Sequence, residues 1–594
     1  MKRRVADIIM DILAQNRITQ CFAVVGGGAM HLNNALALND NINKVFNHHE
    51  QACAMAAEAY ARYSGKMAFV CVTSGPGATN AITGVMGCWQ DSLPMLVLSG
   101  QVRYEISVEK SGLDLRYRGM QEFEIIKSVK NMTKYAVMIT DPLSIKRELL
   151  KAIDIATSGR KGPVWLDIPL DIQSAQVEEE DLYAPEQEII EKKATSDDID
   201  FIINKLSSAK RPCLLAGNGI ANSNTIAEFR DFAEKLNIPV ISACIAADAM
   251  YRDYPKYYGL SGSIGPRPGN YIVQNADVIL SLGSSLGFKM TGFAQEKFAP
   301  HAYIISVDID ENEMKKPGLK IHKHIQSELH CFFKTFKNYK GNVSVPTDIN
   351  WIKYCNDLKE RFSPFDPAKD VTTDERVCSY KFWEVYEQYE PSDSISVLGN
   401  NTANSAKLQI GIKQKDQRII ANNNCGSMGA DLPEAVGAAI VSGKEVICLT
   451  GDGSIMMNLQ ELQTIKQYNL PVKVVVFSND GYNAIRQTSK NFFNGKYIGC
   501  TADTGISFPS FERIAFAFDY PYYQCKNNAE LESSMKWLFS QKGCALLEVL
   551  QRLDDPVNPK LMSRINEDGS FSTPSLEDMA PFLPKEEHDK LMFW

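Results

Sequence analysis

Three short, mainly apolar runs recur along the chain, and each leads into a turn that carries two glycines. The runs occupy residues 68–74, 213–216 and 446–450, and the turns that follow are Gly-Pro-Gly, Gly-Asn-Gly and Gly-Asp-Gly. After each turn come a segment of helical character, a proline and a second apolar run, and the proline lies 19 to 22 residues after the first glycine. A buried strand, a helix and a second buried strand produce this pattern. The sequence therefore predicts three βαβ units built on a similar plan.

These units predict the fold class and the domain plan. A βαβ unit with a Gly-x-Gly turn is typical of a doubly wound α/β domain, so we expect three doubly wound parallel-sheet domains. They are expected at residues 1–175, 195–340 and 370–555, and residues 556–594 form a C-terminal tail that either wraps the surface or covers a site. The acidic, polar stretch at 173–197 fits an exposed connection between the first two domains.

The third unit differs from the other two because an aspartate stands at the centre of its turn. Asp452 occupies a position where the first two turns have proline and asparagine. A helix is expected to begin near Met457, and the next strand, residues 472–477, ends just before Asn479. A right-handed crossover brings the carboxyl ends of both strands to one edge of the sheet, where carboxylate and amide oxygens suit Mg²⁺ and a bound phosphate. An ordinary strand-to-helix turn is the alternative, and the second oxygen ligand one strand later makes it the weaker one.

Composition narrows the class of protein. The 594 residues are 44% hydrophobic and 23% charged with a formal charge of −8, which is typical of a globular protein and lacks the basic excess that nucleic-acid binding needs. Asp7, Asp11 and Gln15 interrupt the apolar positions of the N-terminus, which predicts an amphipathic helix rather than a signal peptide. No apolar run approaches the ~20 residues of a membrane span. Fourteen cysteines without CxxC pairs predict buried free thiols in a reducing cytoplasm.

A glutamate follows the second predicted strand of the first domain. Behind a glycine turn at residues 26–28, the chain reaches Glu50 through Phe-Asn-His-His, and a helix rich in small residues begins at Ala52. A carboxylate at a helix N-terminus is favoured by the helix dipole, so a cap and a functional carboxylate are both open interpretations. The glycine turn by itself is a weak signal, and two adjacent histidines are too few for a metal site.

Taken together, these segments resemble a known enzyme family. The Gly-Asp-Gly turn followed one strand later by Asn479 resembles the thiamine diphosphate motif, although Ser478 stands where the first of two asparagines is usual. Further segments are similar to the catalytic subunit of acetolactate synthase and related pyruvate carboligases, at residues 73–80, 91–94, 99–102 and 426–433. The resemblance extends over all three predicted domains.

The resemblance implies a thiamine diphosphate site and the residues that form it. Asp452, Asn479 and the carbonyl of Gly481 are expected to bind Mg²⁺. Glu50 is expected to hydrogen-bond the aminopyrimidine ring and activate the cofactor, and Gln121 is expected to lie beside the substrate. Further cofactor contacts are expected at Gly27, Gly28, Thr73, Gly75, Pro76, Asn80, Gly426, Met428, Gly451, Asp452, Gly453, Ser454, Asn479, Gly481 and Tyr482.

The same resemblance implies roles for the domains and an assembly. The first domain would bind the pyrimidine ring, the third would bind the diphosphate and Mg²⁺, and the central domain would hold FAD, as it does in acetolactate synthase. Residues 217–219 and 307–310 are compatible with a nucleotide, although no GxGxxG is present. A homodimer or homotetramer with active sites between subunits is implied. We expect a cytoplasmic protein without nucleic-acid or membrane partners.

Three departures from the family pattern concern the second substrate. Leu170 stands where acetolactate synthases have lysine, Ser285 and Lys289 stand where they have arginine, and Thr488 stands where a tryptophan shapes the acceptor pocket. The changes remove a cation and a large aromatic group from the acceptor side, which favours a larger or uncharged acceptor. We therefore predict decarboxylation of pyruvate and transfer of the two-carbon unit to a carbonyl acceptor such as a keto-sugar nucleotide.

Other functions remain open at this level. Within the same family, the chain could make acetolactate from two pyruvate molecules, or act as a 2-oxoacid decarboxylase or oxidase that does not ligate. A non-catalytic regulatory homologue is a further alternative, from a different class of protein. Retention of Glu50 beside both metal ligands argues against it, because a binding module needs the metal ligands but not the activating carboxylate.

Overall fold

The chain forms two compact units in the computed structural model, which describes residues 2–184, 191–365, 375–565, 568 and 570–593. The first unit combines residues 1–190, 422–448 and 454–473, and the second combines residues 191–421, 449–453 and 474–594. Within the described residues, no helix is long and apolar enough to cross a membrane.

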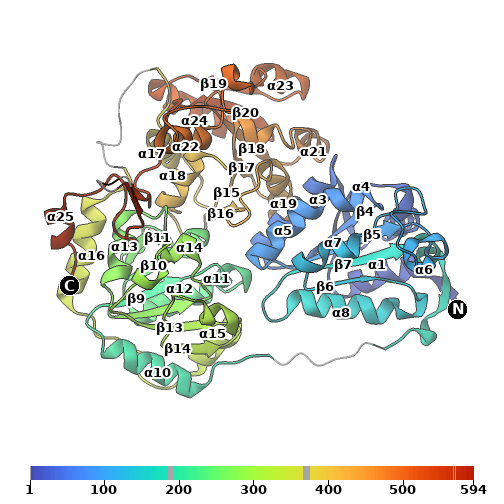
Figure 1. Cartoon of the computed structure of the whole chain (residues 1–594), viewed down its shortest axis with the longest axis horizontal. Coiled ribbons are helices and arrows are strands. Elements are labelled where there is room, and N and C mark those ends of the chain that lie inside the picture. The colour runs from blue at the N-terminus through green and yellow to red at the C-terminus, as the bar shows by residue number, and fades with distance from the viewer. Residues whose placement is uncertain (1, 185–190, 366–374, 566–567, 569, 594) are drawn as a thin grey trace. The chain divides into compact units, whose positions relative to one another are not determined.

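The first sheet is six-stranded and parallel, in the order β3-β2-β4-β5-β7-β6. Helices α1 (Val5–Gln15) and α8 (Ile145–Thr157) pack together on one face, and α3 (Glu50–Ser64) and α5 (Ile82–Asp91) pack together on the other (Figure 1). Its strands are β2 (Gln20–Ala23), β3 (Asn43–Phe46), β4 (Ala68–Val72), β5 (Met95–Gln101), β6 (Tyr135–Met138) and β7 (Pro163–Pro169).

The second sheet is also six-stranded and parallel, but its order is β11-β10-β9-β12-β13-β14. This is the strand order of dinucleotide-binding sheets, in which the chain builds three strands outward on one side and then three on the other. Its strands are β9 (Pro212–Ala216), β10 (Val240–Ala243), β11 (Tyr257–Ser261), β12 (Val278–Leu282), β13 (Tyr303–Asp308) and β14 (Lys323–Gln326).

The third sheet has the order β16-β15-β17-β18-β20-β19, which repeats the plan of the first sheet strand for strand. The prediction of three doubly wound parallel-sheet domains is confirmed. In each sheet the two strands of the predicted βαβ unit are neighbours, and only the second sheet departs from the common order. The strands are β15 (Ile395–Leu398), β16 (Arg418–Ala421), β17 (Val446–Gly451), β18 (Val472–Ser478), β19 (Tyr522–Cys525) and β20 (Ala545–Leu550).

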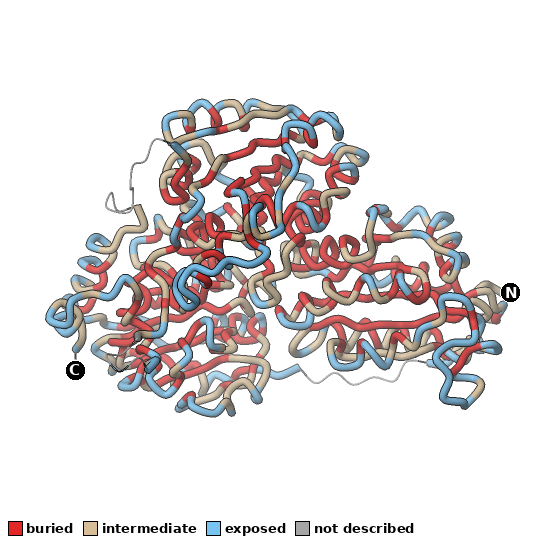
Figure 2. Tube along the Cα trace, turned by 45° about the horizontal axis from the view of Figure 1, so that its top comes forward, coloured by how far each residue is buried: buried red, intermediate tan, exposed pale blue. Residues whose placement is uncertain are grey.

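The central strands β4, β9 and β17 are buried along their whole length (Figure 2). Their sequences are therefore mainly apolar, without the alternation of a half-exposed strand. All fourteen cysteines are free thiols, and all except Cys425 and Cys544 are buried.

Element boundaries differ from the sequence-based expectation at two places. The helix expected to begin near Met457 begins only at Glu461, as α21 (Glu461–Gln467), and a separate short helix, α20 (Asp452–Ile455), directly follows β17. Part of the expected connection is ordered, because β8 (Gln176–Glu178) pairs antiparallel with β1 (Lys2–Arg4). Residues 185–190 of that connection and 370–374 of the predicted third domain lie outside the described residues, and the exact domain limits stay predictions.

The C-terminal tail packs along α13 (Arg267–Asn275), a helix of the central domain whose nine residues are all buried. Asn270 Nδ2 donates to the carbonyl of Leu576 at 3.0 Å, and Gln274 Nε2 donates to Glu577 Oε2 at 2.7 Å. These buried hydrogen bonds fix the tail to the central domain. Residues 566, 567, 569 and 594 of the predicted tail lie outside the described residues.

Candidate functional site

The three predicted glycine turns lie at comparable positions of their sheets. The strand order reverses between β2 and β4 in the first sheet, between β9 and β12 in the second, and between β15 and β17 in the third. The turns at residues 75–77, 217–219 and 451–453 follow β4, β9 and β17. Doubly wound proteins bind ligands at such reversal points, outside the carboxyl ends of the strands. All three turns are therefore placed where a ligand site is expected.

Asp452 is a buried acid at the reversal point of the third sheet. It is 3% exposed, its Oδ1 accepts from the backbone N–H of Gly453 at 2.8 Å, and its Oδ2 accepts from the N–H groups of Asn479 and Gly481 at 2.9 and 3.4 Å. Burial raises the pKa of this carboxyl to about 6, and the backbone donors partly oppose the shift. In the part of the chain that the structure describes, no lysine or arginine forms an ion pair with Asp452. Its charge is available to a bound cation.

Asn479 and the turn glycines complete this group, and all of them belong to the second unit. Asn479 is 4% exposed, and its Oδ1 accepts a hydrogen bond from Arg486 Nη2 at 3.2 Å. A Cβ on Gly453 would lie 2.1 Å from the ring of Tyr482, so only glycine lets this ring pack against the turn. A Cβ on Gly481 would likewise lie 2.1 Å from a backbone carbonyl. These buried oxygens, together with an Asp452 carboxylate that forms no ion pair with a described lysine or arginine, are hard ligands that fit Mg²⁺.

Glu50 begins helix α3 in the first unit and is half-buried. Its Oε2 accepts a hydrogen bond from Asn80 Nδ2 at 3.0 Å, and Asn80 ends the short helix α4 (Pro76–Asn80) that follows the first glycine turn. A Cβ on Gly77 would approach Glu50 Oε1 to 3.3 Å. The structure therefore brings together Glu50 and the Gly-Pro-Gly turn. The side chain is held at one oxygen by a neutral donor.

Several other predicted residues of the first domain lie next to this turn. Thr73 Oγ1 accepts from the N–H of Gly28 at 3.0 Å, whereas Gly27 has open space around its α-carbon. Gly75 has φ of +55°, and a Cβ there would lie 2.3 Å from the carbonyl oxygen of Gln121. Gln121 itself is exposed and has φ of +62°. The loop that carries Gln121 thus lies directly over the turn.

The loop at residues 426–429 is tied to the start of α3 within the first unit. Asn458 Nδ2 donates to the carbonyl of Gly429 at 2.8 Å and to Gln51 Oε1 at 3.0 Å. Met428 is half-buried, and Gly426 has φ of +61° with open space around it. The Ser454 hydroxyl accepts from the Gly429 N–H at 2.9 Å and donates to a carboxylate at 2.6 Å. The Ser454 side chain therefore stabilises this loop.

Sequence reasoning missed a buried group of charges where α3 meets α19 (Asp431–Ser442). Arg62 Nη2 donates to Glu58 at 2.5 Å and to Asp91 at 2.6 Å, and Asn422 donates to Glu58 at 3.1 Å. Glu434 of α19 is fully buried nearby, and burial raises its pKa well above the usual value. One guanidinium does not balance three buried carboxylates, and burial raises the pKa of Glu58 to about 7. The i,i+4 spacing of Glu58 and Arg62 was the available signal.

Asp167 is a second buried acid of the first domain, on β7. Its Oδ1 accepts from Ser99 Oγ at 2.6 Å, its Oδ2 accepts from Gln101 Nε2 at 3.0 Å, and burial raises its pKa to about 7 from 3.8. The folded state therefore holds the proton more tightly than the unfolded state. The stability contributed by this proton is complete below pH ~4 and is lost as the pH rises to ~7.

We expect Asp167→Asn to remove this loss of stability. Relative to the wild type, the variant should gain free energy of unfolding as the pH rises from ~4 to ~7, up to about 4 kcal/mol for a shift of this size. Denaturant unfolding of both proteins at a series of pH values measures the difference in free energy of unfolding. The titration of Glu58 cancels in this difference because both proteins contain Glu58. A difference that does not change with pH would contradict the assignment.

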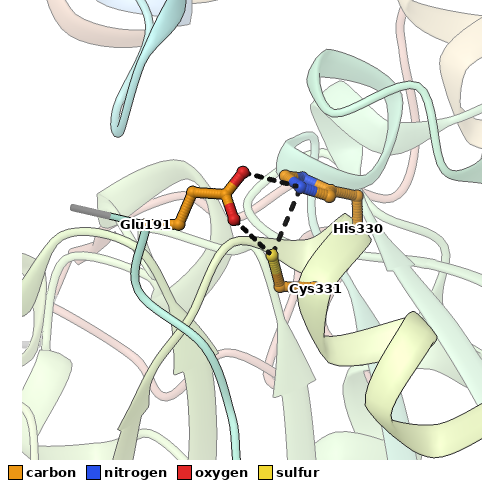
Figure 3. Close-up of side chains that lie close together, drawn as sticks. All are labelled: Glu191, His330 and Cys331. Atoms are coloured by element: carbon orange, nitrogen blue, oxygen red, sulfur yellow. Dashed lines mark hydrogen bonds and ion pairs between the residues drawn. The ribbon is translucent and has the colours of Figure 1, made fainter. Parts of the chain in front are cut away.

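A second set of metal-ligand side chains lies at the start of α15 (Leu329–Asn338). Glu191, His330 and Cys331 point toward one another (Figure 3), with His330 Nε2 3.2 Å from Cys331 Sγ and 3.9 Å from Glu191 Oε1. Glu191 and His330 are exposed, and Lys193 forms an ion pair with Glu191 at 2.8 Å. Burial raises the pKa of the Cys331 thiol. A protonated thiol beside a carboxylate already paired with an ammonium is a poor metal site, and we assign it no function.

Comparison with protein families identifies the class to which this fold and site belong. Residues 3–126 match the N-terminal TPP binding domain of thiamine pyrophosphate enzymes, residues 199–329 match their central domain, and residues 398–549 match their C-terminal TPP binding domain. The chain belongs to the thiamine pyrophosphate enzyme family. The matches include strands of all three sheets, so the recognition made from short motifs is confirmed.

Within this family, the chain is similar in sequence to acetolactate synthases. It is 29% identical over 547 residues to the acetolactate synthase isozyme 2 large subunit of Escherichia coli (strain K12), which covers 92% of this chain and 95% of that protein. It is also 29% identical to the acetolactate synthase large subunit of Lactococcus lactis subsp. lactis (strain IL1403), over 95% of both chains. The chloroplastic acetolactate synthase of Arabidopsis thaliana shows 29% identity over 94% of this chain. The chain is a thiamine diphosphate-dependent enzyme similar to acetolactate synthase.

Proposed function

We propose that this enzyme decarboxylates pyruvate and transfers the remaining two-carbon unit to a carbonyl acceptor, using thiamine diphosphate and Mg²⁺. The observation that carries the proposal is the presence of both chemical parts of the site in one chain. A half-buried glutamate stands at a helix N-terminus beside the first glycine turn. At the third turn, a buried aspartate that forms no ion pair with a described lysine or arginine stands beside Asn479. The similarity to acetolactate synthases over nearly the whole chain supports pyruvate as the donor.

Each residue of the site has a distinct task in this proposal. Thiamine diphosphate supplies the electron sink for the loss of carbon dioxide. Asp452, Asn479 and the Gly481 carbonyl would hold Mg²⁺, and Mg²⁺ would hold the diphosphate. The Glu50 carboxyl would exchange a proton with the aminopyrimidine ring, and the Asn80 amide fixes the orientation of that carboxyl. In the same proposal, Gln121 would contact the substrate.

The acceptor side supports a substrate larger than pyruvate. Thr488 is exposed on α22 (Asn483–Phe492), and its Oγ1 donates to the carbonyl of Ala484 at 3.0 Å, so its short side chain is turned back onto its own helix. On the same helix, Ile485 is 46% and Phe492 is 47% exposed. Open apolar surface around a short polar side chain suits an acceptor with an extended body. A keto-sugar nucleotide is the acceptor that we propose.

Product analysis tests this proposal directly. We expect carbon dioxide release from pyruvate with thiamine diphosphate and Mg²⁺, a ligated product when a keto-sugar nucleotide is added, and little acetolactate from pyruvate alone. Thr488→Trp should lower the yield with the large acceptor by at least about 10-fold, because the new ring would occupy its space, while release of carbon dioxide from pyruvate continues. Chromatography and mass spectrometry of the products measure both effects.

Two outcomes of this experiment would change the assignment. Robust formation of acetolactate from pyruvate alone would establish acetolactate synthesis and contradict the proposal of a larger acceptor. Absence of any decarboxylation in the loaded protein would overturn the proposed reaction and favour the regulatory alternative.

Further parts of the proposal follow from the family. We propose FAD for the central domain, whose strand order is that of dinucleotide-binding sheets. At the reversal point of this sheet, the backbones of Gly217 and Gly283 approach closely, since a Cβ on Gly217 would lie 2.2 Å from the carbonyl oxygen of Gly283. A homodimer or homotetramer with active sites between subunits and a cytoplasmic location also stay proposals.

A further inference from the structure

Asn479 can serve as a metal ligand only if its amide presents oxygen, and not nitrogen, to the cation. Asparagine oxygen and nitrogen are nearly equivalent in shape, so the surrounding hydrogen bonds must select the orientation. In the structure, Asn479 Nδ2 donates to Gln551 Oε1 at 3.1 Å. Gln551 is fully buried at the end of β20. The orientation of Asn479 therefore depends on the orientation of a second buried amide.

The orientation of Gln551 is determined by a carboxylate behind it. Gln551 Nε2 donates to Asp555 Oδ2 at 3.0 Å, to Ser379 Oγ at 2.8 Å and to Thr402 Oγ1 at 3.2 Å. Asp555 Oδ2 also accepts from the N–H of Ser379 at 2.9 Å and from the Ser379 hydroxyl. Ser379 alone gives this oxygen two donors, its N–H and its hydroxyl, so the carboxylate oxygen is an acceptor. Gln551 must therefore turn its NH₂ toward Asp555, which leaves only its Oε1 to face Asn479.

Arg486 selects the same orientation of Asn479 from the other side. It is 7% exposed, and its Nη2 donates to Asn479 Oδ1 at 3.2 Å, to the Asn479 carbonyl at 2.9 Å and to the Leu553 carbonyl at 2.6 Å. A guanidinium has donors and no acceptor, so it tolerates only the oxygen of the amide. Both neighbours thus require Nδ2 toward Gln551 and Oδ1 away from it.

We propose that Gln551, held by Asp555, is a positioning residue that fixes the Asn479 amide with its oxygen toward the metal. The inference rests on the proposed function, because it takes Asn479 to be a Mg²⁺ ligand. All of the groups involved lie in the second unit and are buried. A reversed amide would point two N–H donors at the cation and remove one ligand. Outer partners of metal ligands commonly contribute 10- to 100-fold to metal affinity in this way.

Substitution of Gln551 tests the inference through Mg²⁺ affinity. We expect Gln551→Met to weaken Mg²⁺ about 10- to 100-fold, because the acceptor for Asn479 Nδ2 is lost and the shape is kept. Gln551→Glu keeps an acceptor for Asn479 and takes up a proton beside Asp555, so it should bind Mg²⁺ more tightly than the methionine variant. The readout is the Mg²⁺ dependence of thiamine diphosphate binding, measured by calorimetry on the full chain without substrate.

Gln409→Met is the matched control, because Gln409 is another buried glutamine of the same unit with two partners, Tyr380 and Pro559. It should change thermal stability and leave Mg²⁺ affinity near the wild-type value. Equal Mg²⁺ affinity of Gln551→Met and Gln409→Met would overturn the inference. If the methionine variant does not fold, Gln551→Asn replaces it in the test. Its shorter side chain moves the amide oxygen away from Asn479 Nδ2 and keeps a polar amide in the buried network. Wild-type protein that binds no Mg²⁺ with thiamine diphosphate would instead overturn the proposed function.

Discussion

Exchange of Glu50 for glutamine is expected to slow pyruvate decarboxylation by about 100- to 10,000-fold, the usual contribution of a positioned proton-transfer group. Glutamine keeps the size of the side chain and can still accept from Asn80 Nδ2, which lies 3.0 Å from the carboxylate. It cannot exchange a proton with the cofactor ring. The loss should therefore appear in turnover, whereas the affinity for thiamine diphosphate stays near the wild-type value. Steady-state turnover and calorimetric titration separate these effects.

Two further measurements make this result specific to Glu50. Proton exchange at the reactive carbon of bound thiamine diphosphate, followed by NMR, should slow together with turnover. Glu105→Gln, at an exposed glutamate of the same domain, should leave both rates unchanged. Unimpaired proton exchange in Glu50→Gln would show that another group activates the cofactor.

Replacement of Asp452 by asparagine is expected to have the second large effect, on assembly of the site. Both oxygens of Asp452 accept backbone hydrogen bonds, so an NH₂ in place of one oxygen faces an N–H donor, and the negative charge for the cation is lost. Loss of a direct ligand should exceed the 10- to 100-fold effect of an outer partner, so we expect Mg²⁺ affinity to fall by more than about 100-fold. Titration of Mg²⁺ in the presence of thiamine diphosphate measures it.

Asp480→Asn provides the control for this substitution. Asp480 lies between Asn479 and Gly481 in the turn that follows β18, but its side chain is 62% exposed and its partner is Arg376, at 2.6 Å. An exposed ion pair contributes little, so Mg²⁺ affinity should change by only a few-fold. If both variants lost Mg²⁺ equally, the negative charge of the region, and not the Asp452 carboxylate in particular, would account for the binding.

Several features of the protein could be predicted from the sequence because their signals are local. Strands buried on both faces leave unbroken apolar runs, and the three runs with glycine turns proved to be β4, β9 and β17. Crossover handedness predicted that Asp452 and Asn479 meet, and the 2.9 Å hydrogen bond between them confirms the meeting. The roles of these residues and of Glu50 in catalysis stay predictions.

Other features could not be predicted because they depend on distant partners. The helix expected from Met457 begins only at Glu461, and the Asn458 side chain just before it bonds Gly429 and Gln51. The buried charges of Glu58 and Glu434 come from helices far apart in the sequence, so no spacing pattern joins them.

The sequence by itself determined the three βαβ units, the glycine turns and the acidic residue that distinguishes the third turn. These depend on residues within one unit, where hydrophobic period and turn chemistry act over short distances. Only the tertiary structure decided the strand orders, which place each turn at a reversal point and give the central sheet its different plan. It also decided the orientation of the Asn479 amide, because Gln551 and Asp555 reach it only after β18 and β20 have taken their places in one sheet. Strand pairing joins segments that no local pattern connects.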